Sequence, residues 1–158
     1  MVPNNDVYLR KVKDIYRTMK SIDLYTAVKK EGFTSASLII SDVDYAMPKA
    51  SWLTGTFYDF YQEWRFDHNL NEWSNKNDCD NAACLFYTFA QICHAKSDRA
   101  EQGISVGELF YFIGGDKTRG HAINIAITDK GAIYIEPQSG KTLSLTKTEK
   151  ESSWFVRF

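Results

Sequence analysis

The sequence predicts an α+β protein, with helices in the first part of the chain and an antiparallel sheet in the second. Apolar residues recur at three- and four-residue steps up to about residue 96, and they alternate with other residues from about residue 104 onward. The 158 residues fit one domain, and 44% hydrophobic residues suffice for a core without disulfides or metals. We expect a single domain, 1–158, with a helical N-terminal part (1–72), a core that carries the candidate site (73–138) and C-terminal strands (139–158).

The first segments follow from local signals. Asp6–Glu31 has apolar residues at helical spacing with Lys and Arg between them, and Gly32 is a natural helix stop. Ala36–Ile40 favours a short strand. We expect a loop at Tyr45–Pro48, because Pro48 disfavours helix in the residue before it.

Two more helices are predicted. Ser51 is a candidate cap for an aromatic-rich helix over Trp52–Arg65. A polar, Asn-rich loop follows over His68–Asp78. The third helix begins near Asp78 or Cys79 and runs to about Lys96, and it is apolar nearly all round, which predicts a buried central helix.

The remaining chain reads as strands separated by turn residues. The segment 129–131, Asp-Lys-Gly, joins two of them in a hairpin. We expect helices on one side of an antiparallel sheet. The predicted strands are Ile104–Ile113, His121–Thr128, Ala132–Glu136, Thr142–Leu145 and Trp154–Phe158.

Charge and hydropathy exclude several classes of protein. The net charge is −1 and no run of Lys or Arg occurs, so we expect no nucleic-acid partner. No apolar run is long enough to span a bilayer, and Met1–Lys13 is polar, unlike a signal peptide. We therefore expect a soluble, cytoplasmic protein without a membrane partner.

The three cysteines all fall on the third predicted helix. Cys79, Cys84 and Cys93 lie five and nine residues apart, which places them on different faces, where they are poor disulfide partners. A reducing compartment is the simplest interpretation. We expect Cys84 and Cys93 in the core. A zinc site formed with His94 fits no common ligand spacing, so no metal and no cofactor are expected.

Cys79, His121 and Glu136 have the chemistry of a catalytic triad. A cysteine in the first turn of a helix feels the positive end of the helix dipole, which favours the reactive thiolate. A histidine can take its proton, and a third polar group can orient the histidine. In a tight hairpin, the start of the first strand lies beside the end of the second, so His121 and Glu136 should be neighbours.

Other polar residues surround this candidate site. Trp73, Asn77 or Gln138 could supply a side chain that binds an oxyanion or substrate, together with N–H groups of the helix start. Asp78 and Asp80 oppose thiolate formation at the cysteine between them. Asp78 is also a candidate helix cap, and Asp80 could instead orient a basic substrate group or bond to a loop.

At these residues the chain resembles the papain-like cysteine hydrolases, especially NlpC-type and CHAP amidases, and the bacterial transglutaminase-like cysteine proteinases. Asp78–Ala82 is similar to the helix start of the transglutaminase-like group. Val106–Tyr111 and Gly120–Ile123 are similar to two strands of CHAP and NlpC domains. Glu136 falls where CHAP domains carry the glutamate that orients the histidine, and Gln138 falls near their additional polar residue.

The resemblance covers Trp73–Gln138, and it implies a papain-like or transglutaminase-like fold and, more generally, suggests a phage-encoded protein. Asn81 departs from the pattern, because the transglutaminase-like group commonly has an acidic residue there. Asp6–Leu70 matches no family. The implied activity is that of a cysteine-dependent hydrolase or acyltransferase acting on the amide bond of a peptide, a protein or a small molecule.

Two non-enzymatic interpretations stay open. The same scaffold could serve as a binding or sequestering protein, which holds a peptide, sugar or nucleotide in the cleft without turning it over. The acidic neighbours of Cys79 favour this alternative. A third interpretation is a structural protein of a larger assembly, with the aromatic second helix as its docking surface. The oligomeric state does not follow from the sequence.

Overall fold

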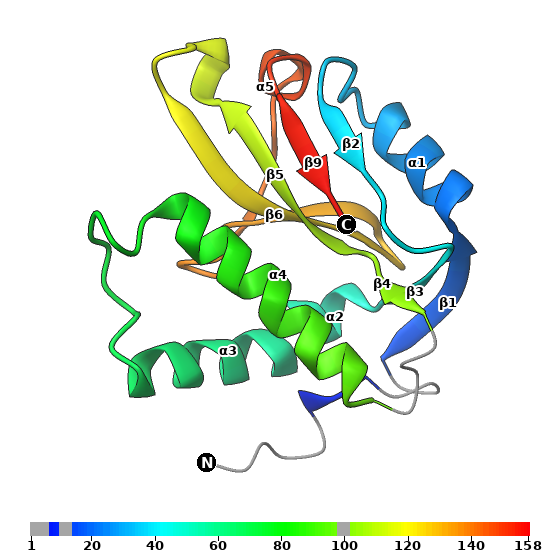
Figure 1. Cartoon of the computed structure of the whole chain (residues 1–158), viewed down its shortest axis with the longest axis vertical. Coiled ribbons are helices and arrows are strands. Elements are labelled where there is room, and N and C mark those ends of the chain that lie inside the picture. Colours follow the sequence, from blue (N-terminus) through cyan, green and yellow to red (C-terminus); the bar gives the residue numbers. More distant parts are fainter. Residues whose placement is uncertain (1–6, 10–13, 98–101) are drawn as a thin grey trace.

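The computed structural model describes residues 7–9, 14–97 and 102–158. It confirms the α+β class, with helices packed against a strongly twisted sheet (Figure 1). The helices are α1 (Ser21–Lys30), α2 (Ala50–Leu53), α3 (Thr56–Asp67), α4 (Cys79–Ala95) and α5 (Lys147–Glu151), with a 3-10 turn at Ile113–Gly115.

The strands form two sheets. The smaller sheet has the order β1-β3-β4, and the larger has the order β2-β9-β5-β6-β7-β8. Two neighbouring pairs, β2–β9 and β3–β4, are parallel, so the sheets are mixed and not purely antiparallel as predicted. The strands are β1 (Ile15–Lys20), β2 (Ser37–Ile39), β3 (Asp44–Pro48), β4 (Gly103–Ile104), β5 (Val106–Phe112), β6 (Gly120–Thr128), β7 (Gly131–Ile135), β8 (Thr142–Leu143) and β9 (Phe155–Arg157).

Helices cover both faces of the larger sheet, which corrects the expectation of helices on one side. On one face, Leu24 and Val28 of α1 pack in a cluster with alternate residues of β6, such as Ile123. On the other face, α3 and α4 pack in a second cluster with residues such as Ala126. Figure 1 shows α3 and α4 together, apart from α1.

The predicted hairpin is confirmed. β6 and β7 pair antiparallel, with Thr128 opposite Gly131 at the turn. Gly131 has φ +86°, a left-handed conformation that glycine adopts without steric cost. Strand β6 and the central helix α4 also lie close to the bounds that the sequence predicted for them.

The predicted N-terminal helix is wrong in its first half. Ile15–Lys20 is strand β1, which pairs with β3, and helix α1 occupies only Ser21–Lys30. Of the predicted helix, residues 6 and 10–13 lie outside the described ranges. The expected stop at Gly32 is confirmed, since α1 ends at Lys30 and Gly32 has φ +101°.

Two further predictions need correction. The segment predicted as a loop is strand β3. Pro48 lies at its last position, opposite Ile15, where the pairing with β1 has a bulge-like irregularity that tolerates a missing N–H. The predicted helix Trp52–Arg65 is broken into α2 and α3 at Gly55, and Ser51 caps neither of them. Helix α5 was not predicted, although Thr146 and Glu149 form a capping box at its start.

The cysteine predictions have a mixed outcome. All three thiols are free, and Cys93 is buried as expected. Cys84 is exposed, so its expected place in the core is wrong; its sulfur accepts a hydrogen bond from Arg157 at 3.7 Å. Within the described ranges, no helix is long and apolar enough to cross a membrane.

We expect His94 to make folding stability depend on pH. Burial lowers the pKa of His94 below its usual 6.5, and this outweighs its hydrogen bond with the Gln102 carbonyl oxygen and the charge of Asp42. A lowered pKa means that the folded state favours the neutral ring. The stabilisation is therefore complete above pH 6.5 and is lost as the pH falls toward the folded-state pKa, at up to about 1.4 kcal/mol per pH unit.

Urea unfolding at pH 7.5 and pH 5 tests this expectation. His94→Gln should lose less stability between the two pH values than the unsubstituted protein. His68→Gln is the matched control, because His68 is exposed on the C-terminal side of α3 and should leave the loss unchanged. Equal losses in all three proteins would contradict the assignment to His94.

Candidate functional site

Helix α4 places Cys79 at its first residue. Asp78 precedes it in an extended conformation (φ −93°, ψ −163°), but its side chain makes no capping hydrogen bond. The helix begins here because a polar loop ends and the apolar run of α4 starts, and Ala82 donates its N–H to the Asp78 carbonyl oxygen at 3.0 Å. The thiol of Cys79 is partly buried, at the end of the helix where N–H groups are exposed.

The β6–β7 hairpin brings His121 and Glu136 together. His121 Nε2 and Glu136 Oε2 are 2.9 Å apart, and the two side chains are 21% and 18% exposed. The ring of His121 packs edge-on against Tyr111, its partner across β5 and β6, at 5.8 Å between centroids. The prediction that the hairpin makes His121 and Glu136 neighbours is therefore confirmed.

The contact between His121 and Glu136 is present, whereas the place of Cys79 in the triad stays a prediction. Among the described residues, His121 has its hydrogen bond with Glu136 and Cys79 has none with either. Burial raises the pKa of Tyr111, and the charges of Glu149, Glu136 and Cys79 act in the same direction, so the thiol lies near the ring that packs on His121. Asn124 points toward α4 and donates to the Ala83 carbonyl oxygen at 2.9 Å.

Acidic groups next to the thiol are coupled to each other. A hydrogen bond with Asp78 raises the pKa of the Asp80 carboxyl, and burial and the charge of Asp78 act in the same direction. The two carboxyl groups therefore share a proton more readily than isolated ones would.

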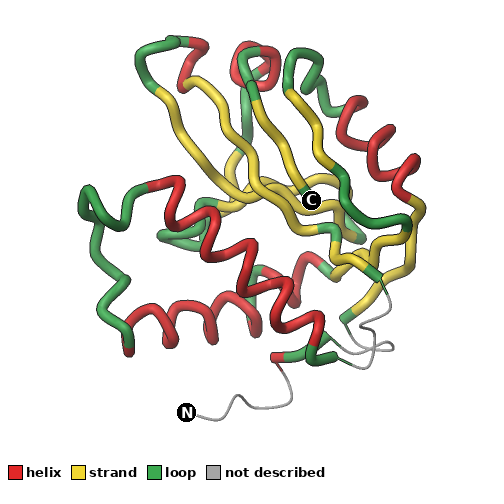
Figure 2. The backbone as a smooth tube through the Cα atoms, viewed as in Figure 1, coloured by secondary structure: helices red, strands yellow, loops and turns green. Residues whose placement is uncertain are grey.

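The other predicted site residues have different surroundings. Asn77 is buried and donates both amide hydrogens within its own loop, to the carbonyls of Leu70 (2.8 Å) and Glu72 (2.7 Å). Trp73 is 66% exposed in the same loop, which Figure 2 shows between α3 and α4. Gln138 has a buried Nε2 without a partner among the described residues. Asn77 therefore stabilises the loop.

Arg65 holds the chain that follows Glu136. Its side chain is 1% exposed, and Nη1 donates to the carbonyls of Pro137 and Gln138 at 3.3 Å each. Nε and Nη2 donate to the Leu70 carbonyl at 2.9 and 2.7 Å. One buried guanidinium thus ties α3 to the loop before α4 and to the segment after β7.

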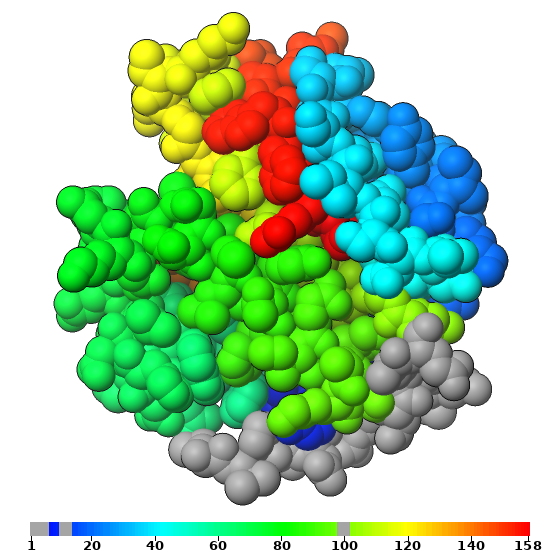
Figure 3. Space-filling model, in the orientation of Figure 1, coloured from blue at the N-terminus to red at the C-terminus, as the bar shows by residue number. Residues whose placement is uncertain are grey.

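The surface between the starts of α4 and β6 is indented. Figure 3 shows this hollow between the green segment that includes the start of α4 and the yellow segment that includes the start of β6. Among the described residues, no group of three or more His, Cys, Asp or Glu side chains is arranged to hold a metal ion.

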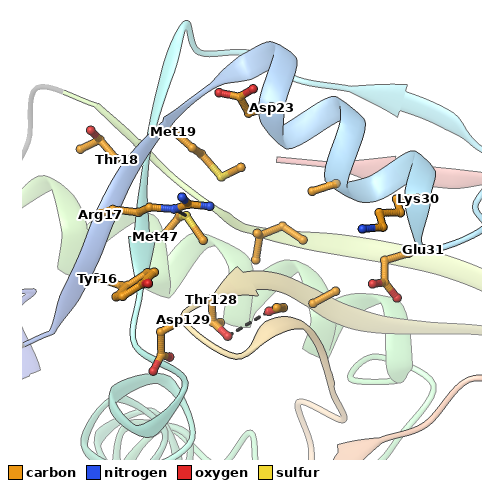
Figure 4. A pocket seen from close by; sticks show the side chains of 14 residues that line it. Tyr16, Arg17, Thr18, Met19, Asp23, Lys30, Glu31, Met47, Thr128 and Asp129 are labelled. Atoms are coloured by element: carbon orange, nitrogen blue, oxygen red, sulfur yellow. Dashed lines mark hydrogen bonds between the residues drawn. The ribbon is translucent and has the colours of Figure 1, made fainter.

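A pocket lies elsewhere, between β1, α1, β3 and the β6–β7 hairpin. Its volume is about 650 Å³, and we call it the β1–α1 pocket. Figure 4 shows its polar residues around an opening to solvent. Its lining consists of Tyr16, Arg17, Thr18, Met19, Asp23, Ala27, Lys30, Glu31, Met47, Ile127, Thr128, Asp129, Gly131 and Ala132.

The pocket combines an apolar floor with polar walls. Met19, Met47 and Ile127 are buried beneath it, while Tyr16 is 56% exposed at its rim. The volume and this combination are typical of sites for small molecules. Sequence reasoning missed the pocket because it predicted helix over Ile15–Lys20. The two buried residues of β1, Ile15 and Met19, lie four residues apart, a spacing that also fits a helix.

Comparisons with known proteins show similarity of fold. No protein-family model and no curated protein sequence matches the chain. Solved structures do match, among them one described as the PSL1a-E64 complex (TM-score 0.65, 16% identity) and one of Polyporus squamosus lectin bound to the human-type influenza-binding epitope Neu5Aca2-6Galb1-4GlcNAc (TM-score 0.63, 15% identity). They cover 89% of this chain, whereas the chain spans 51% and 49% of theirs.

These findings correct the predicted family and activity. One of the matching structures is of a lectin, and no protein-family model matches, so the assignment to the papain-like or transglutaminase-like hydrolases is wrong. The prediction of a thiol peptidase, amidase or acyltransferase is wrong with it.

Proposed function

We propose that the chain is a non-enzymatic binding protein that holds a small polar ligand of the glycan class in the β1–α1 pocket. The observation that carries the proposal is the pocket itself, a space of about 650 Å³ with hydrogen-bonding side chains above an apolar floor. A small-molecule partner thus replaces the peptide or amide substrate expected from the sequence.

Sugars need this combination of groups. Their hydroxyls both donate and accept hydrogen bonds, and their C–H faces pack on aromatic rings. Thr18 supplies an exposed hydroxyl at the pocket, and Tyr16 supplies an exposed ring. The lectin that shares the fold binds a glycan epitope, which supports the same class of ligand for this chain.

The pocket is built on regular elements, which favours a site formed before the ligand arrives. β1 is held by β3, with Thr18 opposite Ala46 and Met19 opposite Tyr45. The far wall is the turn of the β6–β7 hairpin, where the Thr128 hydroxyl donates to the Gly131 carbonyl at 2.9 Å. Little ordering is therefore required on binding.

Replacement of Tyr16 tests the proposal. Tyr16→Ala should weaken binding of Neu5Aca2-6Galb1-4GlcNAc about tenfold, because the ring loses its contact with the sugar face. Isothermal titration calorimetry gives the change in Kd. Tyr25→Ala is the matched control: Tyr25 is a 45% exposed tyrosine on α1 that does not line the pocket, and its removal should leave Kd unchanged.

Cys79→Ala separates a binding protein from an enzyme in the same experiment. This variant should bind the trisaccharide as the unsubstituted protein does, and Cys79 should react with iodoacetamide no faster than a small thiol. Turnover of an amide substrate that disappears in Cys79→Ala would overturn the proposal. So would the absence of binding to any member of a glycan array.

A further inference from the structure

Another pocket lies along the C-terminal half of α3. Its volume is about 270 Å³, and we call it the α3 pocket. Figure 2 shows this end of α3 at the periphery of the molecule, beside the loop that leads to α4. The pocket shares no residue with the β1–α1 pocket. Its lining residues recur at three- and four-residue steps on one face of the helix, and they are Phe60, Glu63, Trp64, Asp67 and His68.

One wall of the α3 pocket is a row of aromatic rings. Phe60, Trp64 and His68 follow one another at four-residue steps. The rings of Trp64 and His68 stack with 4.2 Å between their centroids. On their other side, Phe60 and Trp64 pack on Phe89 of α4, at 5.5 and 5.1 Å between centroids. The aromatic wall is therefore held in place before a ligand binds.

The other wall carries two carboxylates without a cation. Glu63 and Asp67 are exposed and lie one helical turn apart. Within residues 7–9, 14–97 and 102–158, neither side chain forms an ion pair or a hydrogen bond. No Lys or Arg lines the pocket. Arg65, the nearest cation in the sequence, is buried and donates to backbone carbonyls instead.

These two carboxylates destabilise the helix that carries them. Like charges four residues apart on a helix repel each other. Asp67 is also the last residue of α3, and the helix dipole disfavours a negative charge at that end. A bound cation would relieve both effects, and a neutral or anionic ligand would not. The charge, the dipole and the rings therefore favour the same kind of ligand.

We propose that the α3 pocket binds a small organic ammonium ion. The faces of aromatic rings attract cations, and the ring of tryptophan attracts them most strongly. An alkylated ammonium group fits both walls, because its carbon atoms pack on Phe60 and Trp64 while Glu63 and Asp67 compensate its charge. This site is separate from the β1–α1 pocket, so its test does not depend on glycan binding there.

Calorimetry at constant ionic strength, with three probes, tests the inference. Choline carries the ammonium group, and dimethylbutanol is the neutral alcohol in which carbon replaces the charged nitrogen of choline. We expect choline to bind about tenfold more tightly than the alcohol. Phosphocholine should bind more weakly than choline, because its phosphate meets the two carboxylates. This third probe distinguishes a free ammonium ion from the headgroup of a choline lipid.

Substitutions locate the binding site. Glu63→Gln and Asp67→Asn should each weaken choline about threefold and leave the alcohol unchanged, since an exposed charge contributes modestly. Trp64→Leu should weaken choline about tenfold. Asp59→Asn is the matched control, because Asp59 is an exposed carboxylate in the first turn of α3 that does not line the pocket. It should leave the affinity for choline unchanged.

Four results would overturn the inference. Choline could fail to bind, or it could bind no more tightly than the alcohol. Phosphocholine could bind as tightly as choline, which would show that the carboxylates do not select the ligand. Asp59→Asn could weaken choline as much as Asp67→Asn does, which would show that the attraction comes from the overall charge of the helix. Both variants exchange one exposed polar side chain, so the comparison does not depend on a change of fold.

Discussion

Gly107→Ala is expected to lower the free energy of unfolding by about 3 kcal/mol or more, the upper range for forced overpacking. Gly107 lies on β5, between β6 and β9, opposite Ile125. A Cβ at this position would be 2.1 Å from the Arg157 carbonyl oxygen and 3.0 Å from the Phe158 ring. Since the nearest atom belongs to backbone, no side-chain rotation relieves the clash, and β9 must move.

A displacement of β9 would also disturb contacts other than the one with Gly107. Glu108 is 2% exposed and pairs with Arg157, so a shift of β9 disturbs a buried ion pair as well. Breaking such a pair is costly, because the remaining charge stays buried. We expect a melting temperature about 10 °C lower by calorimetry or circular dichroism, from the usual scaling for a domain of this size.

Gly120→Ala is the control for this substitution. Gly120 begins the neighbouring strand β6, and its Cβ would be 3.3 Å from the end of the Trp154 side chain. A side chain can move by a few tenths of an ångström at little cost, so we expect a change within about 0.5 kcal/mol. Similar losses in both variants would show that the backbone contact of Gly107 does not decide the effect.

Local signals explain which elements were predictable. Helix α4 has a polar start at Asp78 and a long apolar run, and the hairpin has Asp129-Lys130-Gly131 between two alternating strands. Residues close in sequence determine both elements. The sequence therefore correctly predicted that Cys79 begins a helix and that His121 and Glu136 lie near the open end of a hairpin. The spatial relation of His121 to Glu136 followed from the hairpin alone.

Elements that depend on distant pairing were not predictable in the same way. Ile15–Lys20 has apolar residues that fit a helix, but pairing with β3, about 30 residues later, makes it a strand. The same pairing creates one wall of the β1–α1 pocket. Four elements that are separate in sequence line the pocket, and no short motif predicts that they pack together.

The place of Cys79 relative to His121 depends on tertiary geometry, so the triad stays a prediction. The sequence fixes the order of a thiol, an imidazole and a carboxylate, but not the side of the sheet on which each lies. Asn124, which neighbours no predicted site residue in sequence, occupies the α4-facing side and binds the Ala83 carbonyl. A resemblance of short motifs therefore indicated a chemistry that the whole-chain comparisons do not support.

Arg65→Met should be the second most destabilising change, with an expected loss of about 3 kcal/mol. The guanidinium is 1% exposed and donates four hydrogen bonds to the carbonyls of Leu70, Pro137 and Gln138. Charged donors contribute more than neutral ones, and methionine keeps the volume but removes every donor. The arginine also packs over the Tyr61 ring, 5.5 Å from its centroid.

The loss of stability in Arg65→Met should be limited, because each of the three carbonyls that Arg65 contacts also accepts a hydrogen bond from another side chain. Asn77 Nδ2 also binds Leu70, the Tyr58 hydroxyl also binds Pro137, and Gln62 also binds Gln138. Arg65→Lys keeps the positive charge but not the planar set of N–H donors of the guanidinium. Its free energy of unfolding should therefore lie between those of the unsubstituted protein and Arg65→Met. Chemical denaturation measures the ranking, and hydrogen exchange should show faster opening around residues 70–77 and 137–140.

Arg17→Met is the matched control, since Arg17 is an exposed arginine whose Nε donates only to a thioether. Its stability should stay within about 0.5 kcal/mol of the unsubstituted protein. If Arg65→Met is no more destabilising than Arg17→Met, the buried guanidinium does not hold the two loops. The contrast separates the two arginines by burial, because Arg65 donates to carbonyls near Glu136 from a buried position and Arg17 is exposed at the β1–α1 pocket.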